Sequence, residues 1–431
     1  MSGTNTNYSW RMMGTHASGM NKDGWAFVVS ASRRWAEEGY FEGTDYSANS
    51  LFASVEKKIN DKHSLNLTAI YAQNSRGKNS PNTKEVNDLM GIQYNSYWGW
   101  QDGKKRNSRD KDVEEPIVML SHYWKITEKT TLNTNVAFQT GSIGNSRIDY
   151  QLGNNPDPTY YRNLPSYYSN LNGGLNPIEN AYYSSAFRSR SQIDWNAMYI
   201  ANQNSAFPGR SAYVLYEDRT DDNQLSANSI LNSSISENVS LTAGANFRKL
   251  RSHNHQNLLD LLGGQYFLDI DPFYSGDASQ SNLNNPNRQV GEGDTYGYNY
   301  LLHALTFDGF TQFKFTYDKA DFYLAQSFSR TEYQREGLYR NGIYADNSYG
   351  KGESITFENF GFKGGLTYKL NGKNYLDFNG LYQTKAPSLR NSFSNARMNN
   401  VITPDLTSEK ITSADASYIL RAPKFKARLT G

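Results

Sequence analysis

The sequence predicts an all-β protein, an antiparallel β-barrel built to cross a membrane. Three observations support this fold class. Apolar and polar residues alternate along many segments, the chain is 14% aromatic although its mean hydropathy is -0.75, and short turns alternate with long polar connections. A period of two is typical of strands, whose successive side chains point to opposite faces. A wall with one apolar face, one polar face and long hydrated loops has this composition.

The clearest hairpin lies between Ser50 and Gln73. Apolar residues share one face of each of its two strands: Leu51, Ala53, Val55 and Ile59 in the first, and Leu65, Leu67, Ala69 and Tyr71 in the second. The polar segment 60–62 forms the turn between them. In chain order, we expect strands or hairpins at 6–17, 24–36, 50–73, 116–126, 132–139, 223–251, 300–336 and 354–386, and a last hairpin from about Ser408. This gives about fourteen strands of roughly 10–14 residues, close to the length of a tilted transmembrane strand.

The lengths of the connections alternate along the chain. Tight turns fall near residues 21, 61, 128, 237, 319, 372 and 423, whereas the other connections are long, the largest being 75–115, 142–222, 252–299, 337–353 and 387–407. In an antiparallel sheet, alternate connections lie at opposite ends. We therefore expect short periplasmic turns at one rim and long extracellular loops at the other. A soluble barrel or sandwich is the less favoured alternative.

The alternation also predicts which way side chains point. We expect eight apolar residues to face lipid: Leu65, Leu67, Val136, Phe138, Leu241, Phe247, Phe362 and Leu366. Polar neighbours should face the lumen: Asn66, Asn135, Thr242 and Lys363. Leu241 is expected to be a site in the middle of the membrane.

Composition excludes or disfavours several classes of function. The absence of cysteine rules out disulfides and thiolate metal sites, and a net charge of +2 gives no electrostatic reason to expect a nucleic-acid partner. No catalytic constellation is visible, so we expect neither an enzyme nor a cofactor. The first eleven residues are polar, which does not fit a signal peptide.

Two groups of potential metal ligands are present, and neither is favoured as a metal site. His253 and His255 are interpreted as polar residues at the start of a loop, although on a strand both would share one face. Three aspartates at 269, 271 and 277 lack the order of an EF-hand. The apolar stretch 257–268 is expected to form a short helix packed into the loop. We therefore predict no metal site.

Several segments together resemble a known family. They are 94–109 (YNSYWGWQDGKKRNSR), 154–166 (NNPDPTYYRNLPS), 31–45, and the pair 385–391 and 404–410 (KAPSLRN and PDLTSEK). The pattern resembles the TonB-dependent receptors of the outer membrane, in particular the large receptors of the Bacteroidota. The resemblance implies energy-coupled uptake of an iron chelate, glycan, peptide or cobalamin. It also implies outer-membrane lipid, TonB, an unidentified nutrient and, as a further candidate, a surface lipoprotein as partners.

The same resemblance bears on domain organisation. Such receptors have about 22 strands around a plugged lumen, more than this chain supplies. We therefore expect residues 1–431 to be part of a barrel domain, an internal fragment without the signal peptide, TonB box, plug and C-terminal strands. A barrel that serves as a non-transporting scaffold of an outer-membrane assembly or secretion complex is the alternative function, and a passive porin is disfavoured by the loop sizes.

Two loop segments combine aromatic rings with cations. The candidate ligand-binding residues are Tyr94, Tyr97, Trp98, Trp100, Lys104, Lys105, Arg106 and Arg109 in the first, and Tyr160, Tyr161, Arg162, Tyr167 and Tyr168 in the second. Rings beside cations bind sugars by stacking or anionic chelates by charge. The alternative is that the rings brace the loops or belong to an interfacial girdle.

Overall fold

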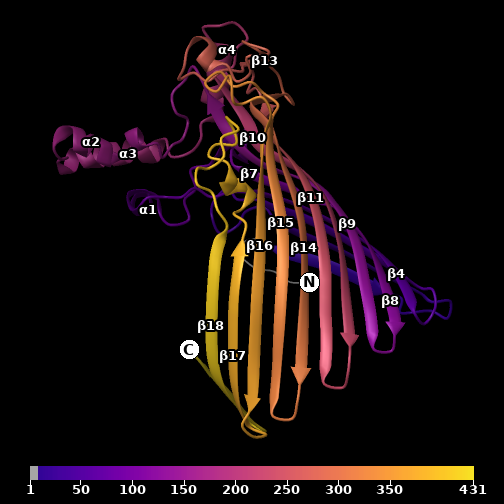
Figure 1. Ribbon diagram of the computed structural model, residues 1–431. Helices are drawn as coiled ribbons and strands as arrows, with labels where there is room; N and C mark the ends of the chain where they lie inside the picture. Colours follow the sequence, from indigo (N-terminus) through magenta and orange to yellow (C-terminus); the bar gives the residue numbers. More distant parts are fainter. Residues whose placement is uncertain (1–7) are drawn as a thin grey trace.

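One large antiparallel sheet dominates the computed structural model, which describes residues 8–431 (Figure 1). Its 15 strands follow one another in chain order, so every neighbour is a hairpin partner or is reached over one long loop. The strands are β1 (Trp10–Ala17), β2 (Trp25–Ala36), β3 (Tyr46–Lys58), β4 (His63–Gly77), β7 (Asp110–Glu114), β8 (Ile117–Thr127), β9 (Thr130–Tyr150), β10 (Tyr213–Ser234), β11 (Val239–Asp260), β14 (Thr295–Thr316), β15 (Ala320–Gly337), β16 (Gly350–Lys369), β17 (Asn374–Lys385), β18 (Glu409–Ala422) and β19 (Phe425–Thr430).

The predicted strand number is confirmed once β7 and β8 are considered together. Both pair with β4 and with β9, and they are separated only by Glu115 and Pro116. Proline has no N–H to donate to the hydrogen bonds between strands, so the strand is interrupted at Pro116 and then resumes in the same sheet. The 15 strands therefore make fourteen paths across the wall. Of the predicted first strand, residues 6 and 7 lie outside the described residues.

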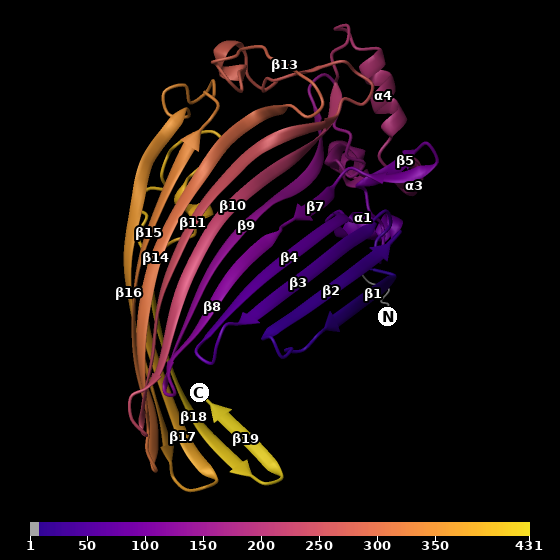
Figure 2. The same ribbon diagram turned by 90° about the vertical axis from the view of Figure 1, so that its right-hand side faces the viewer.

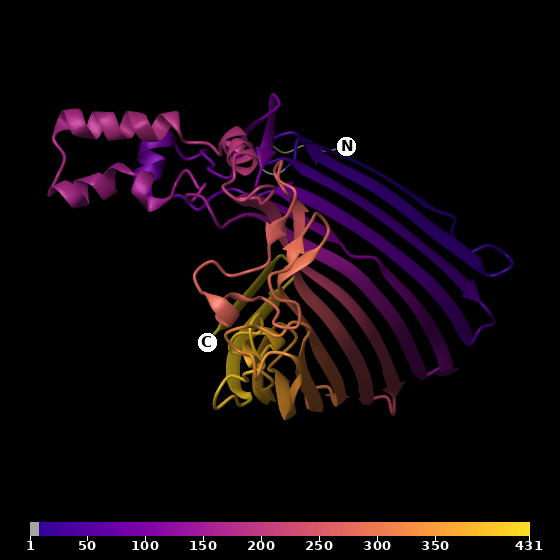
Figure 3. The same ribbon diagram turned by 90° about the horizontal axis from the view of Figure 1, so that it is seen from above.

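The sheet is strongly curved, and the predicted separation of turns from loops is confirmed. Figure 2 shows the bend of the wall, and in Figure 1 the tight turns lie at the lower rim with the long loops at the upper rim. Seen from above, the loops after β11 and β17 gather inside the curve (Figure 3). Among the described residues, β1 and β19 form the two edges of the sheet and do not pair with each other.

The register places the two predicted sets of side chains on opposite faces. Leu67 pairs with Leu120, which pairs with Val136, and the row continues through Ala227 to Phe247. On the other face, Asn66 leads through Ser121 and Asn135 to Asn228. Loops cover that polar face. For example, Phe393 of the loop after β17 packs on Tyr300 and Leu302 of β14. The polar face is therefore the inner one and the apolar face the outer one.

The outer face changes character part of the way up the strands. We call its lower part the apolar band; its uppermost residues in the central strands are Leu225, Phe247, Leu305, Phe328 and Phe360. The next outward residues are polar or charged: Asn223, Lys249, His303, Arg330 and Glu358. In β11 the band runs from Val239 to Phe247, which matches the roughly 9–11 residues needed to cross a bilayer. The strands continue well above it.

Two sequence-based expectations are corrected by these lengths. The central strands are not 10–14 residues long, since β10, β11 and β14 each have 22 residues. The alternation of apolar and polar residues ends at the top of the apolar band. The strands continue above it, because hydrogen bonding between backbones does not require apolar side chains. Leu241 lies two residues after the start of β11, so it is near the short-turn rim rather than in the middle of the band.

The long loops hold most of the buried core. They contain α1 (Lys84–Met90), α2 (Pro165–Asn172), α3 (Pro177–Ser189), α4 (Trp195–Gln203), the short hairpins β5 (Trp98–Gln101) with β6 (Lys104–Asn107) and β12 (Phe267–Leu268) with β13 (Gln289–Val290), and 3-10 turns at Tyr161–Asn163, Gly276–Ser279 and Leu389–Ser392. The helix expected at 257–268 was wrong, because β11 extends to Asp260 and β12 follows. Leu258, Leu261 and Phe267 of this stretch pack in one buried cluster with Val214 and Tyr216 of β10. Among the described residues, no helix is long and apolar enough to cross a membrane.

Candidate ligand-binding site

The first predicted aromatic segment forms the β5–β6 hairpin, and its rings divide into buried and exposed ones. Tyr94 is 2% exposed and donates a hydrogen bond to the carbonyl of Ser191, while Trp98 is 5% exposed. Trp100 meets the Trp98 ring edge-on and is 57% exposed. Tyr97 is half-buried under the guanidinium of Arg109, 5.0 Å from its ring centre. Trp100 is therefore the aromatic residue of this segment most open to a ligand.

The cations of this segment are largely paired within the protein. Lys105 contacts Glu38 at 2.6 Å and lies over the Trp98 ring, and Arg106 contacts Asp260 at 2.7 Å and lies over the Trp195 ring. Lys104 is exposed. These contacts fasten the hairpin to the tops of β11 and α4. Ligand contact by these residues stays a prediction.

The second predicted group is a chain of tyrosines around α2 and α3. The rings of Tyr160, Tyr161, Tyr167 and Tyr168 contact one another in sequence, and Tyr168 stacks on Tyr183 with 3.9 Å between ring centres. Tyr161 and Arg162 are exposed. This group lies with the helices that project sideways from the wall (Figures 1 and 3). The same region meets the first segment where Leu164 and Phe187 pack against the buried ring of Tyr94. The role of the second group in binding a ligand also stays a prediction.

A third site, which the sequence did not reveal, lies at the loop end of the inner face. A hollow of about 370 Å³ is bounded by the tops of β9 and β14 and by the loops 261–294, 338–349 and 386–408. Its lining includes Asp149, Tyr150, Asp271, Tyr296, Tyr298 and Arg397. We call it the inner hollow. It combines ring faces, carboxylates, phenol groups and one cation in a small volume, which suits a polar ligand with many hydrogen-bonding groups.

A bulge in β14 aims two of these tyrosines into the inner hollow. His255 pairs with Asn299 while the next residue of β11 pairs with Tyr296, so β14 has two extra residues at this point. Gly297 has φ 68°, a left-handed conformation that glycine adopts without strain, and its N–H donates to Asp269 at 2.8 Å. The bulge keeps Tyr296 and Tyr298 on the inner side.

Hydrogen bonds and charge fix the polar groups of the inner hollow. Tyr298 donates to Asp218 at 2.8 Å, and Arg397 contacts the same carboxylate at 3.3 Å while lying 4.7 Å from the centre of the Tyr298 ring. Tyr296 donates to Asp149 at 3.1 Å. Burial raises the pKa of Asp149 to about 6 and also raises the pKa of Tyr298. These groups lie above the apolar band, and they form a pre-arranged polar surface.

The loops over the inner hollow are held by two arginines. Arg335, 1% exposed, donates to the carbonyls of Ala396 and Ser348 and to the side chain of Asn400, and so joins the loops 338–349 and 386–408. Arg288 contacts Asp269 at 2.9 Å. Asp269, one of the three aspartates considered for calcium, is thereby committed to a contact within the protein.

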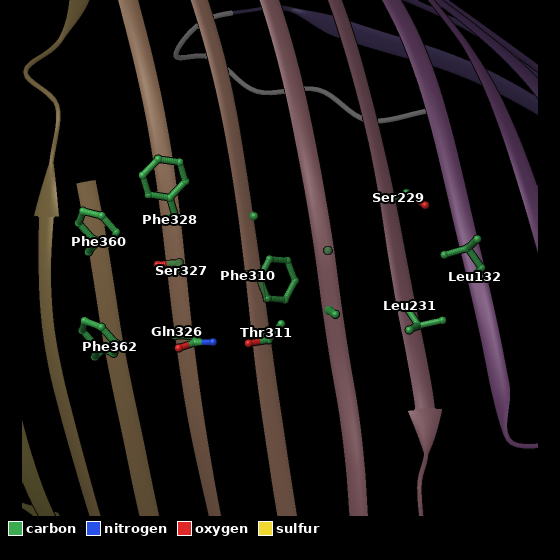
Figure 4. Close-up of a pocket in the computed structure, with 13 residues that line it drawn as sticks. Leu132, Ser229, Leu231, Phe310, Thr311, Gln326, Ser327, Phe328, Phe360 and Phe362 are labelled. Atoms are coloured by element: carbon green, nitrogen blue, oxygen red, sulfur yellow. The ribbon is translucent and has the colours of Figure 1, made fainter. Parts of the chain in front are cut away.

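A larger hollow lies on the opposite face. It measures about 590 Å³ and is bordered by Phe328, Phe360 and Phe362 on one side and by Leu132 and Leu231 on the other (Figure 4). These residues belong to the outer face of the apolar band, far down the strands from the loops. It is a groove in the surface expected to meet lipid acyl chains. We therefore assign the candidate ligand site to the inner hollow.

The sequence carried only a weak signal for the inner hollow. Its residues come from β9, β11, β14 and three loops, separated by up to about 250 residues in the chain, so no local motif joins them. The Tyr-Gly-Tyr order at 296–298 is the one local sign, because glycine inside a strand indicates a bulge.

Comparison with known proteins supports the fold. No model of a protein family matches the chain, and no curated protein matches it in sequence. Among solved structures, it is similar to the siderophore receptor PiuA from Acinetobacter baumannii, with a TM-score of 0.58, 12% identity, and coverage of 97% of this chain and 53% of that one. The ferric citrate transporter FecA matches with a TM-score of 0.60, 7% identity, and coverage of 99% and 48%.

A third similar structure is the ferric-catecholate import receptor Fiu from K12 E. coli. It matches with a TM-score of 0.54, 12% identity, and coverage of 98% of this chain and 56% of that one. The chain thus spans about half the length of the solved structures it matches. At such identities the similarity establishes the fold class, an antiparallel wall of the kind found in outer-membrane transport receptors.

Proposed function

We propose that this chain is the barrel portion of a TonB-dependent outer-membrane receptor that takes up a scarce or bulky nutrient. The observation that supports this most is the inner hollow, which lies at the loop end of the inner face and is roofed by three long loops. A ligand from outside meets these loops first, and the polar inner face leads from there toward the short-turn rim. The rest of the wall, the plug and the TonB box belong, in this proposal, to the remainder of the protein.

The ligand class follows from the chemistry of the inner hollow. Phenol rings, carboxylates and the guanidinium of Arg397 suit an oxygen-rich ligand that both stacks and hydrogen-bonds. The similar structures include receptors for siderophores, ferric citrate and ferric catecholates. A ferric chelate is therefore the first probe, before glycans, peptides and cobalamin.

The uptake proposal is tested in cells that make the protein containing this chain. Cells are supplied with ⁵⁵Fe-labelled ferric chelates, and accumulation is compared in strains with and without TonB and with and without a proton-motive-force uncoupler. We expect accumulation that requires the protein, TonB and the gradient. Accumulation that needs the protein but neither TonB nor the gradient would instead indicate a passive pore.

The assignment to the inner hollow is tested by Arg397→Ala. Loss of the guanidinium removes a cation that lies over Tyr298 and beside Asp218. We expect ligand affinity to fall on the order of 10-fold, the loss of about 1.4 kcal/mol of binding free energy. Arg390→Ala is the matched control, because Arg390 is an exposed cation of the same loop. Equal losses in both variants would show a general charge effect.

The alternative function, a scaffold without transport, is favoured by one feature. The helices α2 and α3 project away from the wall, and Leu171, Ile178 and Tyr182 on them are 64%, 82% and 68% exposed (Figure 3). Apolar side chains gathered on a projecting element often mark a protein contact, and a surface lipoprotein is the candidate partner. Copurification of a lipoprotein that is lost in Ile178→Asp, with uptake of every probe absent, would support the scaffold.

A further inference from the structure

Three potential metal ligands meet on the outer face above the apolar band. Asp221 of β10 pairs directly with His253 of β11, and His255 lies two residues further along the same strand, hence on the same face. One ligand atom from each of the three side chains lies within 4.8 Å of the other two. The two imidazole rings are stacked, with 4.3 Å between their centres. The histidines are thus on a strand rather than at the start of a loop.

His255 has a buried nitrogen without a partner. The residue is 7% exposed, and its Nδ1 makes no hydrogen bond to any described residue. A buried polar atom without a partner is costly and needs an explanation, such as an ion that is not present. An imidazole nitrogen that keeps its lone pair is the kind of atom that binds a divalent metal ion.

Neighbouring residues hold the other two ligands in place. The Nε2 of His253 lies 2.7 Å from the Oδ1 of Asn299. Because an amide oxygen only accepts, Nε2 carries the hydrogen and Nδ1 keeps its lone pair. Asp221 accepts a hydrogen bond from Arg219 at 2.8 Å on one oxygen, Oδ1, which leaves Oδ2 free to bind a metal. Contacts of this kind orient metal ligands in many proteins.

We propose that Asp221, His253 and His255 form a binding site for one divalent transition-metal ion of the Zn²⁺ type. Two imidazoles and a carboxylate suit Zn²⁺, Co²⁺ or Ni²⁺ rather than Ca²⁺ or Mg²⁺, which prefer oxygen alone. Small side-chain rotations bring ligand atoms from their present spacing to about 2.0–2.2 Å from a shared ion. Such an ion ties β10 to β11 above the membrane. The site faces away from the inner hollow, so it does not depend on the proposed transport function.

The experiment uses the purified protein in detergent, with any affinity tag removed. Co²⁺ is added while its visible absorption is recorded, and Zn²⁺ binding is measured by titration calorimetry. We expect one ion per chain with a bound-cobalt spectrum that Zn²⁺ abolishes. His253→Ala and His255→Ala should each weaken binding by on the order of 10-fold or more, and Asp221→Asn should also weaken it.

The matched control is His303→Ala. His303 lies on the outer face of β14 near the same level, but its Nε2 contacts Glu336 at 3.0 Å and it is outside the cluster. This variant should bind like the wild type. His255→Gln provides a second variant in case His255→Ala fails to fold, as judged by heat-modifiable migration. Absence of Co²⁺ binding by the wild type, or equal binding by the wild type and the folded cluster variants, would overturn the proposal.

Discussion

The lower and upper halves of the central strands share one hydrogen-bonded ladder but differ in what surrounds them. In the lower half, the outer face is apolar and exposed, as at Leu67 and Phe362, and the inner face carries small polar side chains. In the upper half, the outer face is charged just above the band, and at the tops of β9 and β10 it is covered by α4, whose Trp195 packs with Tyr213 and Leu215. The inner face packs against loops that contain the other buried clusters. The lower half therefore depends on lipid for its apolar contacts, whereas the upper half supplies its own core.

The largest loss of stability is expected when a core residue of the upper half is replaced. Trp98→Ala removes a buried ring and should destabilise the loop region by about 3–5 kcal/mol. Trp100→Ala removes an exposed ring and should cost little stability. Limited proteolysis of the loops 78–109 and 151–212 measures the difference. If Trp100→Ala alone lowers ligand affinity while the loops stay resistant, the exposed ring contacts ligand; equal cleavage of both variants would contradict the burial difference.

The next effect concerns the lower half. Leu67 lies in the middle of the apolar band, so Leu67→Arg should cost about 2–4 kcal/mol in lipid, whereas Leu241→Arg, near the rim, should cost about 0–1 kcal/mol. Thr242→Arg on the inner face is the control and should also cost little. Urea titration of folding in lipid vesicles gives these values. Equal costs at Leu67 and Thr242 would remove the assignment of faces.

A smaller effect is expected where loops are joined over the inner hollow. Arg335→Met keeps the aliphatic volume but loses hydrogen bonds to Ala396, Ser348 and Asn400, at a cost of about 1.5–3 kcal/mol. The loop 386–408 should become cleavable before the wall unfolds. Arg330→Met is the control, because Arg330 is an exposed residue five positions lower in β15, and this variant should behave as the wild type.

The last effect is a pH dependence in the upper half. Burial, with Asp45 and Asp112 nearby, raises the pKa of Asp110 to about 7, and its Oδ1 makes no hydrogen bond to the described residues. The folded state therefore holds this proton more tightly than the unfolded state, and stability decreases as pH rises from about 4 to 7. Loop cleavage should be slower at pH 5 than at pH 8. Asp110→Asn should abolish the difference, and an unchanged pH dependence would exclude this carboxyl as the cause.

The same contrast explains how far the sequence could be read. Residues such as Leu65, Val136 and Phe362 alternate regularly because lipid and lumen impose opposite demands on successive positions, so the wall, its strand number and its faces were predictable. Above Phe247 the alternation ends, because both faces are polar or packed. The sequence pattern therefore predicts loops where the upper ends of the strands lie. Trp98 and Trp100 look alike in the sequence, and only packing distinguishes them.

The candidate sites were harder to predict for a related reason. The inner hollow brings Asp149, Tyr298 and Arg397 together from distant segments, and the histidine cluster depends on β11 continuing to Asp260. Neither arrangement follows from local spacing. Both arise from the register of long strands, which sequence alternation no longer reports above the apolar band.

The central claim is that the outer face passes from lipid to water between Phe247 and Lys249. The protein has no cysteine, so single cysteines placed at 243, 245, 247, 249 and 251 of β11 carry a spin label without background. In lipid vesicles, collision with oxygen should dominate at 243, 245 and 247, and collision with a water-soluble nickel chelate should dominate at 249 and 251. The inner positions 242, 244 and 246 should favour the nickel chelate throughout. Equal accessibility on both sides of residue 248, or high oxygen accessibility on the inner face, would contradict the account.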